Sequence, residues 1–232
     1  MRFLVKMESQ RGEQIPIDYR RRLISLMKRV FGVREFLENP VRPYTFAVYL
    51  GKDVVFEEET ISGVKFINLR ISTGDPVYGL RLYNGLSSLK GKTHKVGDAE
   101  FVIKEIKLER EGDWSKGSFK SLSPVVVEKP GFSQDSQRVR YPIPMEEGFE
   151  DALLENILRR FRVIKGYEPE IGEFSFSFKY FKEEFIKHYG GHIRAFLGRF
   201  SIKTSNPEIL RFVYQYGLGL RTGQGFGYLE VD

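Results

Sequence analysis

The residues best suited to hold a ligand lie near the end of the sequence, at positions 217–227. This segment reads Gly-Leu-Gly-Leu-Arg-Thr-Gly-Gln-Gly-Phe-Gly, which places five glycines around one arginine. Glycine reaches backbone conformations that other residues avoid, and it lets a ligand approach the chain closely. Exposed backbone N–H groups beside Arg221 would bind an anion such as a phosphate. The segment therefore predicts a loop that holds an anionic backbone through these residues: Gly217, Gly219, Arg221, Thr222, Gly223, Gln224 and Gly225.

Two familiar nucleotide-binding motifs do not fit this loop. The segment has no Gly-Lys-Ser/Thr ending, which excludes a P-loop. Its spacing is Gly-x-Gly-x-x-x-Gly and a strand is expected after it, whereas the dinucleotide fingerprint requires a strand before and a helix after. An ordinary glycine-rich turn before a strand remains the alternative.

A second group of cations lies between residues 18 and 34. Asp18 is the only acid in this stretch, which contains Arg20, Arg21, Arg22, Lys28, Arg29 and Arg34. The whole chain has a net charge of +6. A concentrated basic patch suits a polyanion, most simply nucleic acid. A solvated helix face is the alternative.

The sequence does not favour a metal or a cofactor. It has no cysteine and three histidines, His94, His188 and His192. Gly190 and Gly191 interrupt any helix between the last two, so they do not form a His-Glu-x-x-His pattern. We expect all three histidines in loops or turns, with His94 in a solvated basic loop.

Composition also limits where the protein acts. No apolar run approaches the roughly 20 residues of a membrane span, and the N-terminus is not a signal peptide. We therefore expect a cytoplasmic protein without a membrane partner. The lack of cysteine and the 29% of charged residues favour a thermophilic source.

The elements that must position these groups occur twice in the same order. In residues 1–112 we expect strands at 1–7, 44–50, 64–72 and 99–108, and helices at 18–31, with Asp18 as the cap, and at 76–89. In residues 113–232 we expect strands at 119–127, 174–181, 191–202 and 226–231, and helices at 148–161 and 206–216. Both halves read β-α-β-β-α-β, so we predict an α+β fold of two tandem ferredoxin-like domains with a ligand cleft between them.

Two segments of the second half qualify this scheme. Residues 130–144 form a polar loop punctuated by proline, flanked by the basic residues Arg138 and Arg140. In the strand at 174–181, Phe174, Phe176, Phe178 and Tyr180 alternate with polar residues. We predict that these four aromatic side chains belong to the core rather than to a base-stacking surface.

With two such halves and the C-terminal loop, the sequence resembles the RAMP superfamily of CRISPR systems. Within it, the closer resemblance is to the CRISPR-associated endoribonuclease family that cuts precursor CRISPR RNA within its repeats, family six. The first strand with Ile15–Tyr19, the segment 118–127 with its Leu-Ser-Pro, and the loop Gly217–Gly227 carry the resemblance. Sister RAMP families share the loop, so a structural subunit of a CRISPR effector complex remains an alternative.

The resemblance implies that the chain holds single-stranded or hairpin repeat RNA on its basic face and in the cleft. Together with the loop, the implied RNA contacts are Arg20, Arg21, Arg22, Lys28, Arg29, Arg138 and Arg140. Members of the family cleave without a metal: the ribose 2′-OH attacks the adjacent phosphate and leaves a 2′,3′-cyclic phosphate. This chemistry needs a base, an acid and cations, and many members use a histidine shortly after the first helix.

This sequence departs from the family at that histidine. No histidine lies between residues 8 and 60, and the family position falls near Phe36. The helix tyrosine position falls on Lys28 and the lysine position near Arg42, so the first domain offers Lys28, Arg42, Tyr44 and Lys52 as catalytic candidates. We predict RNA binding with cleavage weak or lost. A histidine-free nuclease and an unrelated ferredoxin-like RNA or regulatory protein remain alternatives, and homodimer formation is left open.

Overall fold

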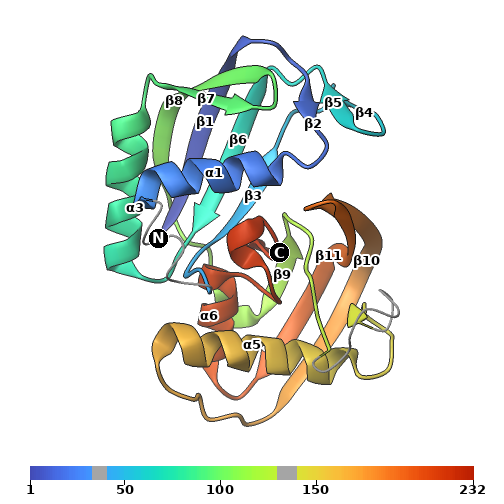
Figure 1. Cartoon of the computed structure of the whole chain (residues 1–232). Helices are drawn as coiled ribbons and strands as arrows, with labels where there is room; N and C mark the ends of the chain where they lie inside the picture. The colour runs from blue at the N-terminus through green and yellow to red at the C-terminus, as the bar shows by residue number, and fades with distance from the viewer. Residues whose placement is uncertain (33–40, 130–139) are drawn as a thin grey trace.

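The computed structural model describes residues 1–32, 41–129 and 140–232. They form two α+β units, drawn one above the other in Figure 1, and the glycine-rich segment lies between them. Each unit has its own antiparallel sheet and its own apolar core.

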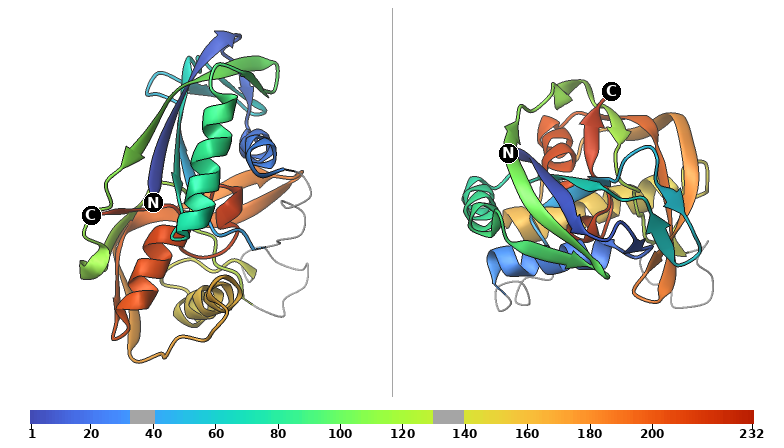
Figure 2. Two further views of the ribbon diagram at one scale, coloured as in Figure 1. Left: turned by 90° about the vertical axis from the view of Figure 1, so that its left-hand side faces the viewer. Right: turned by 90° about the horizontal axis from the view of Figure 1, so that it is seen from above.

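The N-terminal unit is built on a five-stranded sheet in the order β3-β6-β1-β8-β7. Its strands are β1 (Arg2–Arg11), β3 (Thr45–Tyr49), β6 (Phe66–Ser72), β7 (Thr93–Val96) and β8 (Ala99–Glu109). Helices α1 (Arg20–Phe31) and α3 (Pro76–Leu89) cover one face of this sheet (Figure 2). A small sheet of β2 (Ile15–Pro16), β5 (Thr60–Ser62) and β4 (Val55–Phe56) lies at its far end.

The start of α1 corrects one prediction. Asp18 does not cap the helix; its carboxylate instead accepts a bond from Arg21 at 2.9 Å, and Tyr19 occupies the cap position. Leu23, Leu26 and Met27 are buried as the helical spacing predicts, which leaves the arginines on the outer face.

The C-terminal unit repeats the arrangement with the sheet order β10-β11-β9-β12. Its elements are η1 (Trp114–Lys116), β9 (Ser118–Ser121), α5 (Phe149–Lys165), β10 (Phe174–His188), β11 (Gly191–Thr204), α6 (Pro207–Tyr216), η2 (Thr222–Gln224) and β12 (Leu229–Val231). In both sheets the first and third strands of the β-α-β-β-α-β unit lie in the centre. The predicted tandem ferredoxin-like fold is therefore confirmed.

The strand β10 differs from its prediction because its register shifts between Phe178 and Tyr180. Such a bulge moves the following side chains to the opposite face of the sheet. Phe174 and Phe176 pack against the core as expected, whereas Tyr180 is 60% exposed. Phe178, just before the bulge, is also 40% exposed, so the prediction that all four aromatic side chains belong to the core is wrong for Phe178 and Tyr180.

A buried arginine on β1 joins the two units. The Arg2 guanidinium lies between the rings of Tyr214 and Tyr228, 4.2 and 4.4 Å from their centroids. It also donates to the Tyr228 hydroxyl at 3.0 Å and to the Leu229 carbonyl at 2.6 Å. This contact, called the Arg2 clamp below, fixes the glycine-rich segment next to the N-terminal unit.

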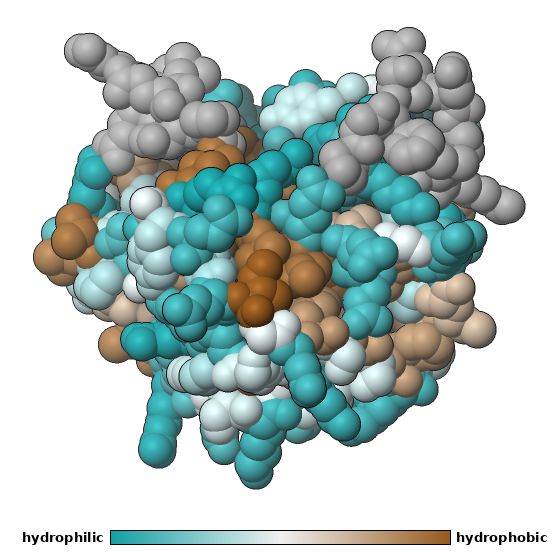
Figure 3. Space-filling model, turned by 90° about the horizontal axis from the view of Figure 1, so that it is seen from below, coloured by the Kyte–Doolittle hydropathy of each residue, from teal (hydrophilic) through white to brown (hydrophobic). Residues whose placement is uncertain are grey.

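The described helices differ from a membrane span in length or apolar character. Among the described residues, every helix is too short or too polar to cross a membrane. Seen from below, the surface is mostly hydrophilic around a small apolar patch (Figure 3).

Candidate nucleic-acid interface

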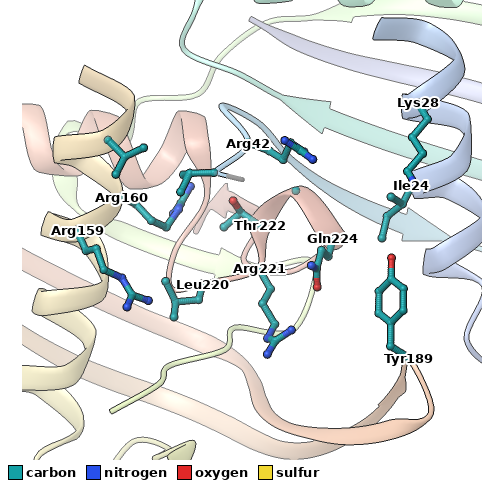
Figure 4. Close-up of a pocket in the computed structure, with 13 residues that line it drawn as sticks. Ile24, Lys28, Arg42, Arg159, Arg160, Tyr189, Leu220, Arg221, Thr222 and Gln224 are labelled. Atoms are coloured by element: carbon teal, nitrogen blue, oxygen red, sulfur yellow. The ribbon is translucent and has the colours of Figure 1, made fainter. Parts of the chain in front are cut away.

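A pocket of about 490 Å³ opens between the two units. We call it the cationic pocket, because five of its lining residues are Lys28, Arg42, Arg159, Arg160 and Arg221. The other described residues that line it are Ile24, Val41, Val163, Tyr189, Leu220, Thr222, Gly223 and Gln224, so none of the thirteen carries a carboxylate. Long side chains approach the pocket from α1, α5, the loop before β3, the β10–β11 turn and the glycine loop (Figure 4). Clustered positive charge in a concave site raises the local concentration of anions.

Two of the four catalytic candidates meet in this pocket. Lys28 projects from α1 and Arg42 precedes β3, and both lie opposite Arg221 from the other unit (Figure 4). Arg221 lies 193 positions after Lys28 and 179 positions after Arg42 in the sequence, and the fold brings all three to one cavity.

Tyr44 and Lys52 do not line the pocket. Tyr44 is fully buried and stacks on Tyr78 with ring centroids 5.8 Å apart, and burial raises the pKa of its hydroxyl well above the usual value. Lys52 lies beyond the other end of β3, in a separate pocket beside Glu13 and Asp53.

None of the four predicted arginines of α1 lines the cationic pocket, and two of them, Arg20 and Arg21, contact residues at its edge. Arg20 donates weakly to the Gly225 carbonyl at 3.4 Å, and the Arg21 guanidinium lies 4.8 Å from the centre of the Tyr189 ring. Arg29 donates to the Thr93 carbonyl at 3.1 Å, and Arg22 has an exposed side chain. Arg20 and Arg21 thus form a basic strip of α1 beside the pocket, whereas Arg29 lies toward β7.

The glycine loop is packed, which contradicts the expectation of exposed amides. The N–H groups of Leu218, Leu220 and Gly227 donate to other backbone carbonyls, each at 2.8 Å. Gly219 has a φ of +73°, and a Cβ atom there would lie 2.2 Å from the Val126 carbonyl oxygen. Gly217 and Gly219 are both buried. The loop therefore reaches the pocket mainly through side chains such as Arg221 and Gln224.

Arg160 holds this loop from beneath. It is only 4% exposed and donates to the carbonyls of Tyr216, Gly217 and Gly219 at 2.7, 2.7 and 3.1 Å. Two of these carbonyls close the C-terminal end of α6, where the helix dipole favours a cation. Burial lowers the pKa of Arg160 to about 9, so the guanidinium remains charged at neutral pH.

Of the two basic residues predicted in the polar loop, only Arg140 is among the described residues, and it does not line the pocket. Arg138 lies outside the described residues. Arg140 forms an ion pair with Glu128 at 2.6 Å, and its guanidinium lies 5.2 Å from the Tyr141 ring centre.

Comparison with known proteins identifies the family. Residues 107–231, more than half of the chain, match the model for the C-terminal part of CRISPR associated protein Cas6. The chain belongs to the Cas6 family.

Relatives of this Cas6-family chain agree with that assignment. It is 28% identical over 228 residues to a CRISPR-associated endoribonuclease-like protein Cas6 of Pyrococcus furiosus, covering 94% of this chain and 92% of the relative. A solved structure of a Cas6-related gene product from the same organism is 26% identical, with a TM-score of 0.87, over 100% of this chain and 98% of the other. The thermophilic source that composition favoured fits these Pyrococcus relatives.

A further solved structure shows the same fold. It is described as a RAMP protein binding different RNA substrates, and it is 24% identical with a TM-score of 0.86. The similarity covers 100% of this chain and 99% of that one.

Two histidines of this Cas6-family chain are buried, contrary to prediction. His94 lies in β7 with its Nε2 2.9 Å from the Arg22 carbonyl, and burial lowers its pKa to about 4. His188 ends β10 and is 3% exposed, with its Nε2 3.0 Å from the Gln224 Oε1. Burial also lowers the pKa of His188. Only His192 is exposed, next to the β10–β11 turn.

Sequence reasoning missed Arg159, Arg160 and Tyr189. The two arginines lie between Leu158 and Phe161 of α5, and the helical periodicity predicts only the apolar face of this helix. Tyr189 lies in the β10–β11 turn with a φ of +51°, which is uncommon for a bulky residue. A tyrosine directly before the Gly190-Gly191 turn was the available signal, because such a turn presents its neighbours to solvent.

Proposed function

We propose that this Cas6-family chain binds CRISPR repeat RNA in the cationic pocket and along the basic strip of α1. The observation that carries the proposal is the meeting of five cationic residues from both units around one pocket whose described lining has no carboxylate. Phosphodiester backbones bind to such sites through Lys and Arg contacts. The relatives support RNA as the polyanion, since one is named endoribonuclease-like and one structural neighbour is described as binding RNA.

Cleavage of the bound RNA is weak or lost in this proposal. Transesterification needs a group that accepts the 2′-OH proton and another that protonates the leaving oxygen. The described lining of the pocket contains neither a histidine nor a carboxylate. His188 is buried and bonded to Gln224, and Tyr44 is buried in the core. The described lining therefore contains cations that can bind a phosphate, but no histidine or carboxylate to transfer the proton.

A binding assay with labelled repeat RNA in EDTA tests both parts. The double variant R42A/R221A is expected to bind at least tenfold more weakly than the wild type. K52A removes one charge outside the cationic pocket and is the matched control, with affinity close to that of the wild type. Equal affinity for repeat and scrambled RNA would argue against a repeat-binding protein.

A histidine-free nuclease is the second candidate, because Lys28 and Arg42 share the pocket. In the same EDTA reaction it would release a product ending in a 2′,3′-cyclic phosphate, and K28A would abolish that product. Intact RNA after prolonged incubation at saturating protein supports the non-cleaving alternative, whether alone or as a subunit of an effector complex.

We further propose that the chain divides into domains 1–112 and 113–232, acts in the cytoplasm and requires no metal or cofactor. The change from one sheet to the other between β8 and β9 supports the boundary. Light scattering with and without RNA tests whether a homodimer forms.

A further inference from the structure

The Gln224 side chain is held in one orientation at the edge of the cationic pocket. Its Oε1 lies 3.0 Å from Nε2 of His188, and none of the described residues accepts a hydrogen bond from its amide nitrogen. Gln224 lines the pocket, whereas His188 lies behind it, 3% exposed between the rings of Tyr189 and Phe226.

The surroundings of His188 decide which way the Gln224 amide faces. The Nδ1 atom of His188 is buried and has no hydrogen-bond partner among the described residues. A neutral imidazole carries its proton on one nitrogen only. A proton on Nδ1 would leave a buried N–H donor without an acceptor, and such orphaned donors are rarer than unpaired acceptors. The proton therefore lies on Nε2, which donates to the Gln224 Oε1 and leaves the amide NH₂ for the pocket.

The pocket then offers almost only hydrogen-bond donors. The side chains of Lys28, Arg42, Arg159 and Arg221 contain hydrogen-bond donors but no acceptor atoms, and the Gln224 NH₂ adds a neutral donor. Cations suit phosphates, whereas a neutral amide beside an exposed aromatic ring suits a base. Tyr189 lines the same pocket and is 55% exposed (Figure 4), and unstacked RNA bases pack on such rings.

We propose that Gln224, oriented by His188 and adjacent to Tyr189, forms a subsite that selects an unpaired keto base, uracil or guanine, over the amino bases cytosine and adenine. Uracil O4 and guanine O6 accept from an amide NH₂, whereas cytosine N4 and adenine N6 present N–H groups that oppose it. This inference rests on the proposed function, because it names the base that accompanies the phosphates in the cationic pocket. Gln224 contacts the base, and His188 is a positioning residue.

Fluorescence anisotropy with labelled U₁₀ and C₁₀ at one salt concentration tests the subsite. These oligomers have the same charge and are both pyrimidines, but they differ at the keto or amino group. The wild type is expected to bind U₁₀ about fivefold more tightly, the equivalent of one hydrogen bond. Q224M keeps the side-chain length but has no donor, and it should bring the ratio of the two affinities close to one.

Three further variants separate the roles. Q224E presents an acceptor and should turn the ratio in favour of C₁₀, although both affinities fall because of its charge. H188F keeps a ring but frees the amide, so the ratio should fall toward one while the salt dependence of binding stays unchanged. K52A changes a residue outside the cationic pocket and should leave the ratio as in the wild type.

The outcomes for the two proposals differ. If the wild type binds neither oligomer nor repeat RNA, the proposed function fails. If it binds U₁₀ and C₁₀ equally, or if Q224M keeps the wild-type preference, the keto-base subsite is overturned while RNA binding stands. H188F adds to the result only if its thermal unfolding matches that of the wild type; otherwise Q224M and Q224E decide.

Discussion

Arg159 and Arg160 are neighbours on α5, yet only one of them faces solvent. Arg159 is exposed at the cationic pocket, whereas Arg160 is buried beneath the glycine loop and donates to three carbonyls. Their side chains have the same chemistry, so their different surroundings allow a matched comparison of binding and stability.

We expect R160M to lower the free energy of unfolding by about 3 kcal/mol, because it removes a buried cation from carbonyls that then lack partners. R159M should leave the stability within about 0.5 kcal/mol of the wild type and weaken RNA binding instead. Urea unfolding followed by circular dichroism measures both. Similar losses of stability in the two variants would contradict the role given to Arg160.

Because His94 is buried, we predict that the free energy of unfolding falls in mild acid. Burial of its ring, together with the Arg29 guanidinium 3.4 Å from Nδ1, favours the neutral form in the folded protein, and its pKa falls from 6.5 to about 4. The unfolded chain therefore binds the proton first. Stability is fully present above pH 6.5, and it should fall by about 1.4 kcal/mol for each pH unit down to about pH 4.

The variant H94Q should unfold with a shallower dependence on pH in this window, whereas H192Q should keep the wild-type slope because His192 is exposed. Denaturant midpoints at pH 7, 6, 5 and 4.5 provide the measurement. A wild-type slope in H94Q would show that other groups control acid unfolding.

At the level of residues, the sequence predicted which cations lie near the pocket better than it predicted which polar side chains are buried. Lys28 and Arg221 were predicted as RNA contacts and Arg42 as a catalytic candidate, and all three line one pocket. The burial of His94, His188 and Arg160 was missed, because each depends on backbone carbonyls or amides from distant segments. Periodicity reports which face of an element is apolar, but it does not report which polar group the fold will cover.

At the level of elements, the glycine loop depends on close contact rather than on freedom to move. Gly219 and Gly91 have similar φ angles of +73° and +77°, but only Gly219 has a carbonyl in the position a Cβ would occupy. Gly91 has nothing within 4 Å of that position. Comparing alanine variants at the two glycines therefore separates the cost of a positive φ from the cost of a steric clash.

We expect G91A to cost about 1 kcal/mol, the usual penalty of the left-handed region for a residue with a side chain. G219A should cost about 3 kcal/mol, because the added methyl group also displaces the Val126 carbonyl. Thermal unfolding of both variants checks the difference. Equal costs would mean that the loop yields easily around residue 219.

The helices were easier to predict than the strands. The helix at 76–89 has the predicted bounds, and Asn206 caps α6 through its side chain. In contrast, β10 is almost twice as long as expected, and its bulge follows from pairing with β11. A helix is specified by local spacing, whereas a register shift arises only between two strands.

At the level of the whole molecule, the tandem fold could be predicted because the β-α-β-β-α-β order is written twice along the chain. The cationic pocket could be predicted only in part, since its walls come from both units, which are joined by long-range contacts such as the Arg2 clamp. No local pattern around Arg2 distinguishes it from a solvated residue of an alternating strand.

The pocket should also determine how RNA affinity changes with salt. Each phosphate contact on a single strand contributes about 0.7 to the slope of log affinity against log salt. We expect the slope of R42A/R221A to be smaller by about 1.4, and that of K52A to equal the wild-type slope. Titrations between 50 and 300 mM salt measure this. An unchanged slope in the double variant would place the RNA elsewhere.

The Arg2 clamp has a consequence for how the protein is made. Its partners Tyr214, Tyr228 and Leu229 lie 212, 226 and 227 positions further along the chain. A ribosome releases the N-terminal sheet long before Tyr228 is synthesised, and N-terminal domains generally fold first. During that interval Arg2 has neither Tyr214 nor Tyr228 to pack against, and the residues of the glycine loop have not yet been synthesised. The surface that we propose for RNA is therefore assembled late, after nearly all of the chain has emerged.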